Sequence, residues 1–63
     1  MKKKELIREL RKCKYCFGYI AYSQHDGAYI PIVKSVFIDF IKGIDDDEYK
    51  YNARVQGDDL YIG

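Results

Sequence analysis

The sequence predicts a small α+β domain with the element order α-β-β-α-β-β, in which a four-stranded, mainly antiparallel sheet carries two helices on one face. Three observations predict this fold: a helical apolar stripe near the start, a second such stripe in the middle, and strict apolar/polar alternation near the end. The 63 residues, 48% apolar and 33% charged, have the composition of one compact domain, residues 1–63. A domain this small buries only about 60% of its unfolded surface, so we expect self-association as a homodimer.

The first apolar stripe predicts an amphipathic helix over residues 2–12, because its members recur at helical spacing while charged residues fall between them. The stripe consists of Leu6, Ile7, Leu10 and Cys13. The cations between them are expected to face solvent.

A β-hairpin is expected next. Residues 15–23 are aromatic and apolar at successive positions, which predicts a strand covered on both faces. Asp26-Gly27 supplies the turn, and residues 28–33 form the returning strand. Pro31 has no N–H to donate, so this strand is expected at a sheet edge or a bulge.

The second apolar stripe predicts another helix, with Ser35 as its N-cap and Gly43 near its end. A strand over residues 33–38 is the alternative, since that segment is nearly unbroken apolar sequence. The helical stripe consists of Val36, Phe37, Phe40, Ile41 and Ile44.

The last segment predicts a second hairpin. Apolar residues alternate with polar ones from Tyr49 onward, and Gly57-Asp58 fits a two-residue turn of type II′. We expect Arg54 to lie on the Tyr61 ring outside the core, a cation–π contact worth about 0.5–1 kcal/mol. The pairs expected across this hairpin are Val55 with Leu60, Arg54 with Tyr61, and Ala53 with Ile62. The residues expected to point toward the core are Tyr49, Tyr51, Ala53, Val55, Leu60 and Ile62.

Charge is distributed unevenly along the chain. Residues 1–14 hold seven Lys/Arg and two Glu, a net charge of +5, whereas residues 39–63 hold seven acidic and three basic residues, a net charge of −4. The basic start lacks the apolar core of a signal peptide, and no segment has the length of a membrane span, so we expect a cytoplasmic protein with no membrane partner.

The cysteines and the single histidine do not predict a catalytic or metal site. Cys13 and Cys16 form a C-x-x-C pair, but structural zinc needs four ligands, and only a site shared between subunits or completed by His25 and Asp26 would supply them. We expect both thiols to be reduced and packed in the core. His25 is expected in a solvated turn with no nucleophile placed beside it. We therefore expect no cofactor and no enzymatic activity.

Two charged sets are candidate binding residues. The acidic set could contact a host protein; it does not have the alternating ligands and glycine of a calcium loop. It comprises Asp45, Asp46, Asp47, Glu48, Asp58 and Asp59. The basic set could bind DNA or RNA together with the polar sheet face, because the chain is also rich in Tyr and Phe. It comprises Lys2, Lys3, Lys4, Arg8, Arg11, Lys12, Lys50 and Arg54.

Two segments, Glu5–Leu10 and Ser35–Gly43 with a hairpin between them, resemble the opening of small phage-encoded type II anti-CRISPR proteins. The resemblance implies a non-enzymatic inhibitor that blocks a host nuclease by covering its DNA-binding surface with acidic side chains. Here those would be the acidic set. Our leading hypothesis is therefore a protein-binding module of a phage or mobile element, and the alternative is a small nucleic-acid-binding module.

Overall fold

The structure is a computed structural model that describes residues 1–63. It confirms the element order α-β-β-α-β-β. The elements are α1 (Lys3–Lys12), β1 (Tyr15–Ala21), β2 (Gly27–Pro31), α2 (Lys34–Lys42), β3 (Ala53–Gln56) and β4 (Asp59–Ile62).

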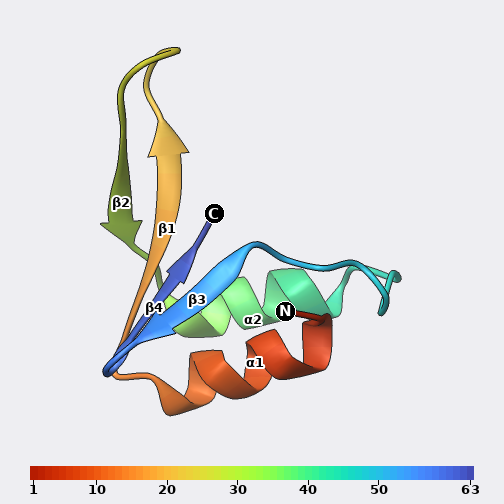
Figure 1. Ribbon diagram of the computed structural model, residues 1–63. Helices are drawn as coiled ribbons and strands as arrows, with labels where there is room; N and C mark the ends of the chain where they lie inside the picture. The colour runs from red at the N-terminus through yellow and green to blue at the C-terminus, as the bar shows by residue number, and fades with distance from the viewer.

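The four strands form one sheet in the order β2-β1-β4-β3. The two outer pairs are antiparallel hairpins, and β1 and β4 run parallel at the centre, so the sheet is mainly antiparallel as expected. Both helices lie on the same side of the sheet (Figure 1). Pro31 ends β2, which is an edge strand, so its missing N–H leaves no gap inside the sheet.

The core lies between the helices and the central strands. Leu6 and Leu10, one turn apart on α1, are fully buried, which confirms the predicted stripe. Cys13 extends the stripe and Cys16 lies under the sheet, also as expected. The complete buried set is Leu6, Leu10, Cys13, Cys16, Ile41 and Leu60. Six buried residues make a small core for a chain of this length.

The second hairpin has the expected register. Val55 pairs with Leu60 and Arg54 with Tyr61. The backbone φ of Gly57 is +61°, and no residue other than glycine has a positive φ, as a type II′ turn requires. Val55, however, is on the outermost strand and is 41% exposed, so the prediction that it is buried is wrong.

The strand predicted from Tyr49 begins only at Ala53. Residues 49–52 are not part of the sheet. Tyr51 pairs with the chain start: the Met1 amino group donates to the Tyr51 carbonyl at 2.8 Å, and the Tyr51 N–H donates to the Met1 carbonyl at 2.6 Å. Only the Asn52 carbonyl continues the pairing with β4, by accepting the Gly63 N–H at 2.6 Å. Tyr51 packs against the core, whereas Tyr49 is exposed, contrary to prediction.

Helix α2 begins earlier than expected, and Ser35 is not its N-cap. The Phe37 N–H already bonds to the Val33 carbonyl, so Val33 is the capping residue and Ser35 lies inside the first turn. Gly43 does end the helix, as predicted. Lys34, the first helical residue, donates from its ammonium group to the Cys13 carbonyl and thereby fixes the start of α2 to the end of α1.

The first hairpin extends beyond the body of the protein (Figure 1). β1 pairs with β4 only as far as Gly18 and then continues with β2 alone. Tyr19, Ile20 and Tyr22 are exposed, so the prediction of a strand covered on both faces is wrong for this half of β1. The molecule exposes 4690 Å², against about 4,200 Å² for a compact monomer of this mass.

Candidate interaction surfaces

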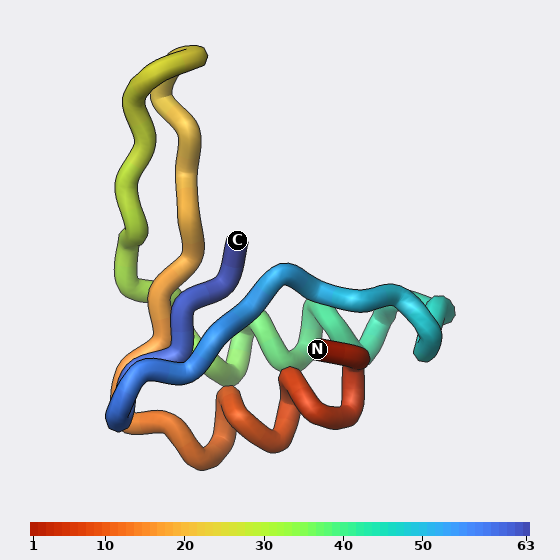
Figure 2. Tube along the Cα trace, in the orientation of Figure 1, coloured from red at the N-terminus to blue at the C-terminus, as the bar shows by residue number.

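The predicted acidic set does not come together in one patch. Residues 45–48 lie in the loop after α2, next to the start of α1, where Lys2 contacts Glu48. Asp58 lies in the β3–β4 turn at the other end of α1, and its carbonyl accepts the N–H groups of Lys14 and Tyr15. Figure 2 shows the loop and the turn on opposite sides of the chain trace. α1 alone separates them by about 15 Å.

Most of the acidic loop is engaged within the protein. Lys2 lies 2.8 Å from Glu48, and Lys3 lies 3.0 Å from Asp47 and also donates to the Ile44 carbonyl. One Asp46 carboxylate oxygen accepts the backbone N–H groups of Glu48 and Tyr49 at 3.0 and 3.1 Å, an Asx turn that shapes the loop. Asp45 has no ion-pair partner.

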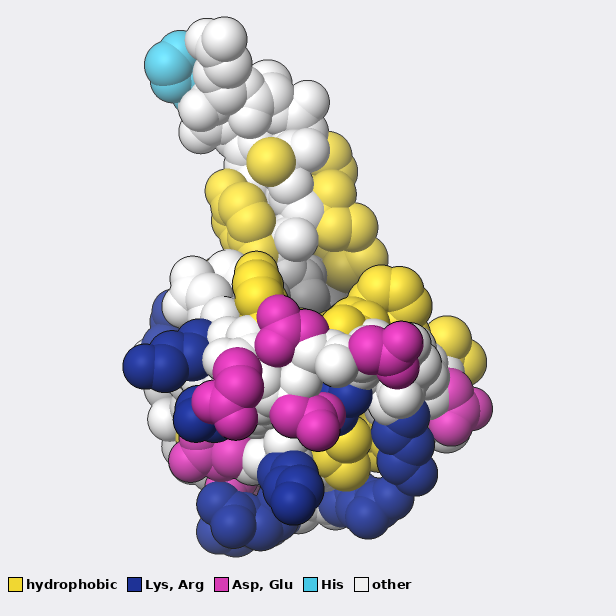
Figure 3. Space-filling model, turned by 90° about the vertical axis from the view of Figure 1, so that its right-hand side faces the viewer, with side chains coloured by type: hydrophobic (Ala, Val, Ile, Leu, Met, Phe, Trp, Pro, Cys, Tyr) yellow, Lys and Arg dark blue, Asp and Glu magenta, His cyan; other side chains and the backbone are white.

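The basic set is also divided. Lys4, Arg8, Arg11 and Lys12 are exposed on the outward side of α1. Only Arg8 has an acidic neighbour, Glu5, at 4.0 Å. Figure 3 shows Lys and Arg side chains below a band of Asp and Glu on the face that carries the acidic loop. Lys50 is exposed beyond that loop, and Arg54 lies across the sheet from the helices.

The helix-free side of the sheet is an aromatic face formed by Phe17, Tyr19, Tyr29 and Tyr61 together with Arg54. Phe17 stacks on Tyr61 at 5.3 Å, and Tyr29 contacts Tyr19 and Tyr61 edge to face. The Arg54 guanidinium lies 5.2 Å from the Tyr61 centroid, which confirms the predicted contact. The rings thus contact one another and Arg54. They lie on the side of the sheet opposite the helices, away from the cations on the outward side of α1.

Neither the thiols nor the histidine forms a reactive arrangement. Burial raises the pKa of both thiols above the ordinary 9.0, and the Glu9 carboxylate, 3.9 Å from the Cys13 sulfur, raises the pKa of Cys13 further. His25 lies in the exposed hairpin turn, where its backbone N–H donates to the Ser23 hydroxyl. No three His, Cys, Asp or Glu side chains gather closely enough to hold a metal ion.

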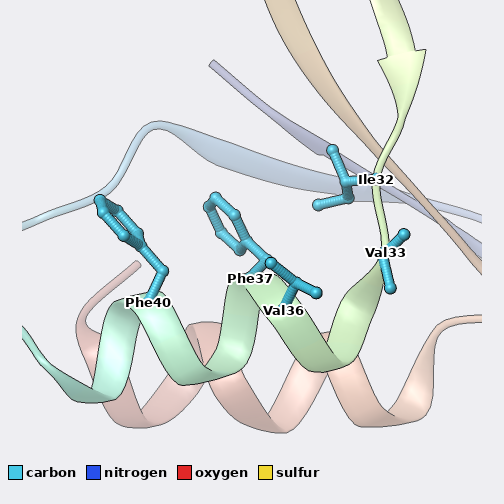
Figure 4. A pocket seen from close by; sticks show the side chains of 5 residues that line it. All are labelled: Ile32, Val33, Val36, Phe37 and Phe40. Carbon is cyan, nitrogen blue, oxygen red and sulfur yellow. The ribbon is translucent and has the colours of Figure 1, made fainter.

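The largest hollow is an apolar groove that sequence reasoning missed. It has a volume of about 360 Å³, and all of its lining is apolar. We call it the α2 groove; Figure 4 shows its lining residues, Ile32, Val33, Val36, Phe37 and Phe40. The signal was present in the sequence: apolar positions cover more of α2 than one buried stripe needs, so one side of the helix had to remain uncovered.

A second hollow lies just beyond the end of α2. It has a volume of about 330 Å³ and is lined by Ile44, Asp46, Tyr49 and Tyr51, and we call it the tyrosine pocket. The two rings meet edge to face, with centroids 4.9 Å apart and planes at 75°. The Tyr51 hydroxyl is buried and has no hydrogen-bond partner.

Comparison with known proteins gives no information about function. No family model, curated protein or solved structure matches the chain. Neither helix has the length and apolar character needed to cross a membrane.

Proposed function

We propose that this protein is a non-enzymatic protein-binding module whose main contact surface is the α2 groove. The observation that carries the proposal is that Val33, Val36 and Phe40 are about two-thirds exposed, at 66%, 65% and 64%. Burying an apolar side chain of this size contributes about 1.5–3 kcal/mol. Only six residues of the chain are buried, yet these three apolar side chains at α2 remain exposed to water. Exposed apolar patches of this kind are typical of surfaces that another protein covers.

Other features support a binding function rather than catalysis, and they support a cytoplasmic location. The thiols are buried with raised pKa values, and the hydrogen bond between His25 and the Ser23 hydroxyl uses the backbone N–H of His25 and not its imidazole. Two unpaired thiols fit a reducing compartment. Self-association stays a prediction, and the test below separates it from binding to another protein.

The resemblance to phage inhibitors makes a host nucleic-acid-processing protein the first partner to test. In this proposal the apolar groove supplies the contact area, and Asp45 and Asp46, the two loop carboxylates that are not ion-paired, supply charge beyond the end of α2. This differs from the expectation that acidic residues alone make the contact, because Asp47 and Glu48 are paired with Lys3 and Lys2.

A second candidate function is nucleic-acid binding by the outward side of α1. It is favoured by the four cations of that side, three of which have no acidic partner: Lys4, Arg11 and Lys12. Binding through phosphates should weaken steeply between about 50 and 200 mM salt. The absence of a mobility shift at 50 mM salt would remove this candidate.

The test uses a photo-crosslinking amino acid placed at Val36, with the same substitution at Arg11 on the outward side of α1 as the matched control. We expect the Val36 probe, and not the Arg11 probe, to capture one dominant protein in cells that express the chain. The purified captured protein should bind the wild-type chain, and Val36→Asp should weaken that binding at least tenfold without lowering thermal stability, since Val36 is exposed.

Three outcomes overturn the proposal. They are capture of nothing at Val36, capture of only a second copy of the chain, and equal capture from both positions.

A further inference from the structure

We propose that the segment bound in the α2 groove is amphipathic and basic, and that one of its Lys or Arg side chains enters the tyrosine pocket. This inference rests on the proposed function and deepens it, because it names the chemistry of the partner. The two hollows form the two parts of one site: an apolar track and a cation-binding end.

The first step is the position of the two hollows: the α2 groove lies along α2, and the tyrosine pocket lies just after the end of the same helix. Val33, Val36, Phe37 and Phe40 line the groove, and Ile44, four residues after Phe40, lines the pocket. Val36, Phe37 and Phe40 are spaced by one, three and four residues on one side of α2, Val33 directly precedes the helix, and Ile44 follows its last residue, Lys42, by two positions. The track is about 16 Å long, which matches a partner helix of about three turns with apolar side chains one turn apart.

The second step is the charge at the pocket. Its position at the C-terminal end of α2 favours a positive group, because the last carbonyls carry the negative end of the helix dipole. Lys3 already binds there, through the Ile44 carbonyl and Asp47. Asp46 lines the pocket and Asp45 precedes it, and neither has an ion-pair partner. An incoming cation therefore meets the Asp46 carboxylate, which forms no ion pair within the protein.

The third step is the aromatic lining. Two tyrosine rings at 75° to each other, with Tyr49 exposed, present ring faces and edges to one hollow. Cations of Arg and Lys side chains bind on such faces, worth about 0.5–1 kcal/mol at exposed sites and more when water is excluded.

The lining also distinguishes a side-chain cation from a metal ion. Calcium takes six to eight oxygen ligands, whereas the pocket offers one carboxylate, which already accepts two backbone N–H groups. A guanidinium or ammonium group needs only one free carboxylate oxygen and an aromatic face.

The experiment uses designed helical peptides of twelve residues as probes, labelled with a fluorophore and measured by anisotropy. Leu occupies positions 1, 4, 5 and 8 and Arg position 12, to match the spacing of the site; a second peptide has the reverse order. In the matched controls, citrulline replaces Arg and removes the charge at constant shape. We expect the better Arg peptide to bind about fivefold to tenfold more tightly than its citrulline counterpart.

Protein variants locate the effect. Asp46→Asn keeps an oxygen for the loop N–H groups but removes the charge, and Tyr49→Ala removes an exposed ring. Each should reduce the preference for Arg to less than twofold. Asp58→Asn, at the far end of α1, is the control and should leave the preference intact.

The outcomes separate the two proposals. Equal binding of Arg and citrulline peptides, or an equal loss in Asp58→Asn, overturns the basic-segment inference and leaves the groove standing. If neither peptide binds, or if Val36→Asp weakens neither, the groove as a docking surface is overturned as well.

Discussion

Lys3 connects the basic start of the chain with its acidic loop. Its side chain is only 13% exposed, and its ammonium group contacts both Asp47 and the Ile44 carbonyl. Lys2 makes a similar contact with Glu48, but both partners are largely exposed. Water and salt screen exposed pairs, so two neighbouring lysines should differ strongly in what they contribute.

We predict that Lys3→Met lowers the free energy of unfolding by about 1–2 kcal/mol, because the end of α2 loses a charge-assisted hydrogen bond. Lys2→Met, the matched control, should change it by less than about 0.5 kcal/mol. Urea denaturation measures both. Equal effects of the two substitutions would show that the contacts of Lys3 carry no particular stability.

The buried thiols give a pH-dependent prediction. Burial raises the pKa of Cys13 and Cys16 in the folded protein, so the unfolded chain loses these protons first as pH rises. Their contribution to stability is therefore complete below pH 9.0 and is lost as pH rises from there toward the folded pKa values. Denaturation midpoints between pH 8 and 10.5 should fall, and Cys13→Ala/Cys16→Ala should fall less over the same interval. A steeper fall in the double variant would contradict the assignment.

At the scale of elements, the sequence predicts the structures that depend on local patterns but not those that depend on contacts between distant parts of the chain. The stripe of α1 and the register of the β3–β4 hairpin follow from spacing and turn chemistry, which short segments contain. The start of β3 does not, because residues 49–52 alternate like a strand while Met1, far away in sequence, takes the backbone hydrogen bonds of Tyr51.

The candidate site shows the same division. Periodicity shows that α2 is apolar on more than one side, but it cannot tell which side the fold covers. Tyr49 and Asp46 lie near the end of α2 because of the conformation of the loop that follows it, which periodicity does not predict. The acidic loop is partly neutralised for the same reason, since Lys2 and Lys3 reach it across more than forty residues of sequence.

Two glycines at element ends should respond oppositely to alanine. Gly57→Ala should destabilise the protein by about 1–2 kcal/mol, because the backbone φ of +61° is unfavourable for a residue with a Cβ. Gly43→Ala should be neutral or stabilising by up to about 1 kcal/mol, since its φ is −76° and a Cβ would lie 3.5 Å from its nearest neighbour. Thermal melts of both variants test this. Equal destabilisation of the two variants would mean that the space available for the Cβ, and not the backbone conformation, determines the effect of the substitution.

The whole molecule consists of a small helix-backed body and a hairpin that extends from it (Figure 1). All six buried residues belong to the body. A two-stranded ribbon is marginal in water by itself; here Tyr29 holds its base, through Tyr19, Tyr61 and a 2.8 Å hydrogen bond to the Gly63 carbonyl.

We predict that shortening the hairpin preserves the fold. Replacing residues 21–27 by Asn-Gly joins Ile20 and Ala28, a pair in register that suits a two-residue turn. The free energy of unfolding should change by less than about 1 kcal/mol, whereas Leu60→Ala, in the body, should cost about 2–5 kcal/mol. Urea denaturation compares them. A loss above about 2 kcal/mol on shortening would show that the hairpin supports the core.

The position of Pro31 has a consequence for behaviour at high concentration. The Ile32 N–H bonds inward to the Cys16 carbonyl, so the neighbouring position on β2 turns its backbone away from the sheet. A strand approaching from outside therefore finds no donor at Pro31. Pro31 therefore interrupts the row of hydrogen-bonding groups at the β2 edge, along which copies of the hairpin would otherwise pair and stack into fibrils.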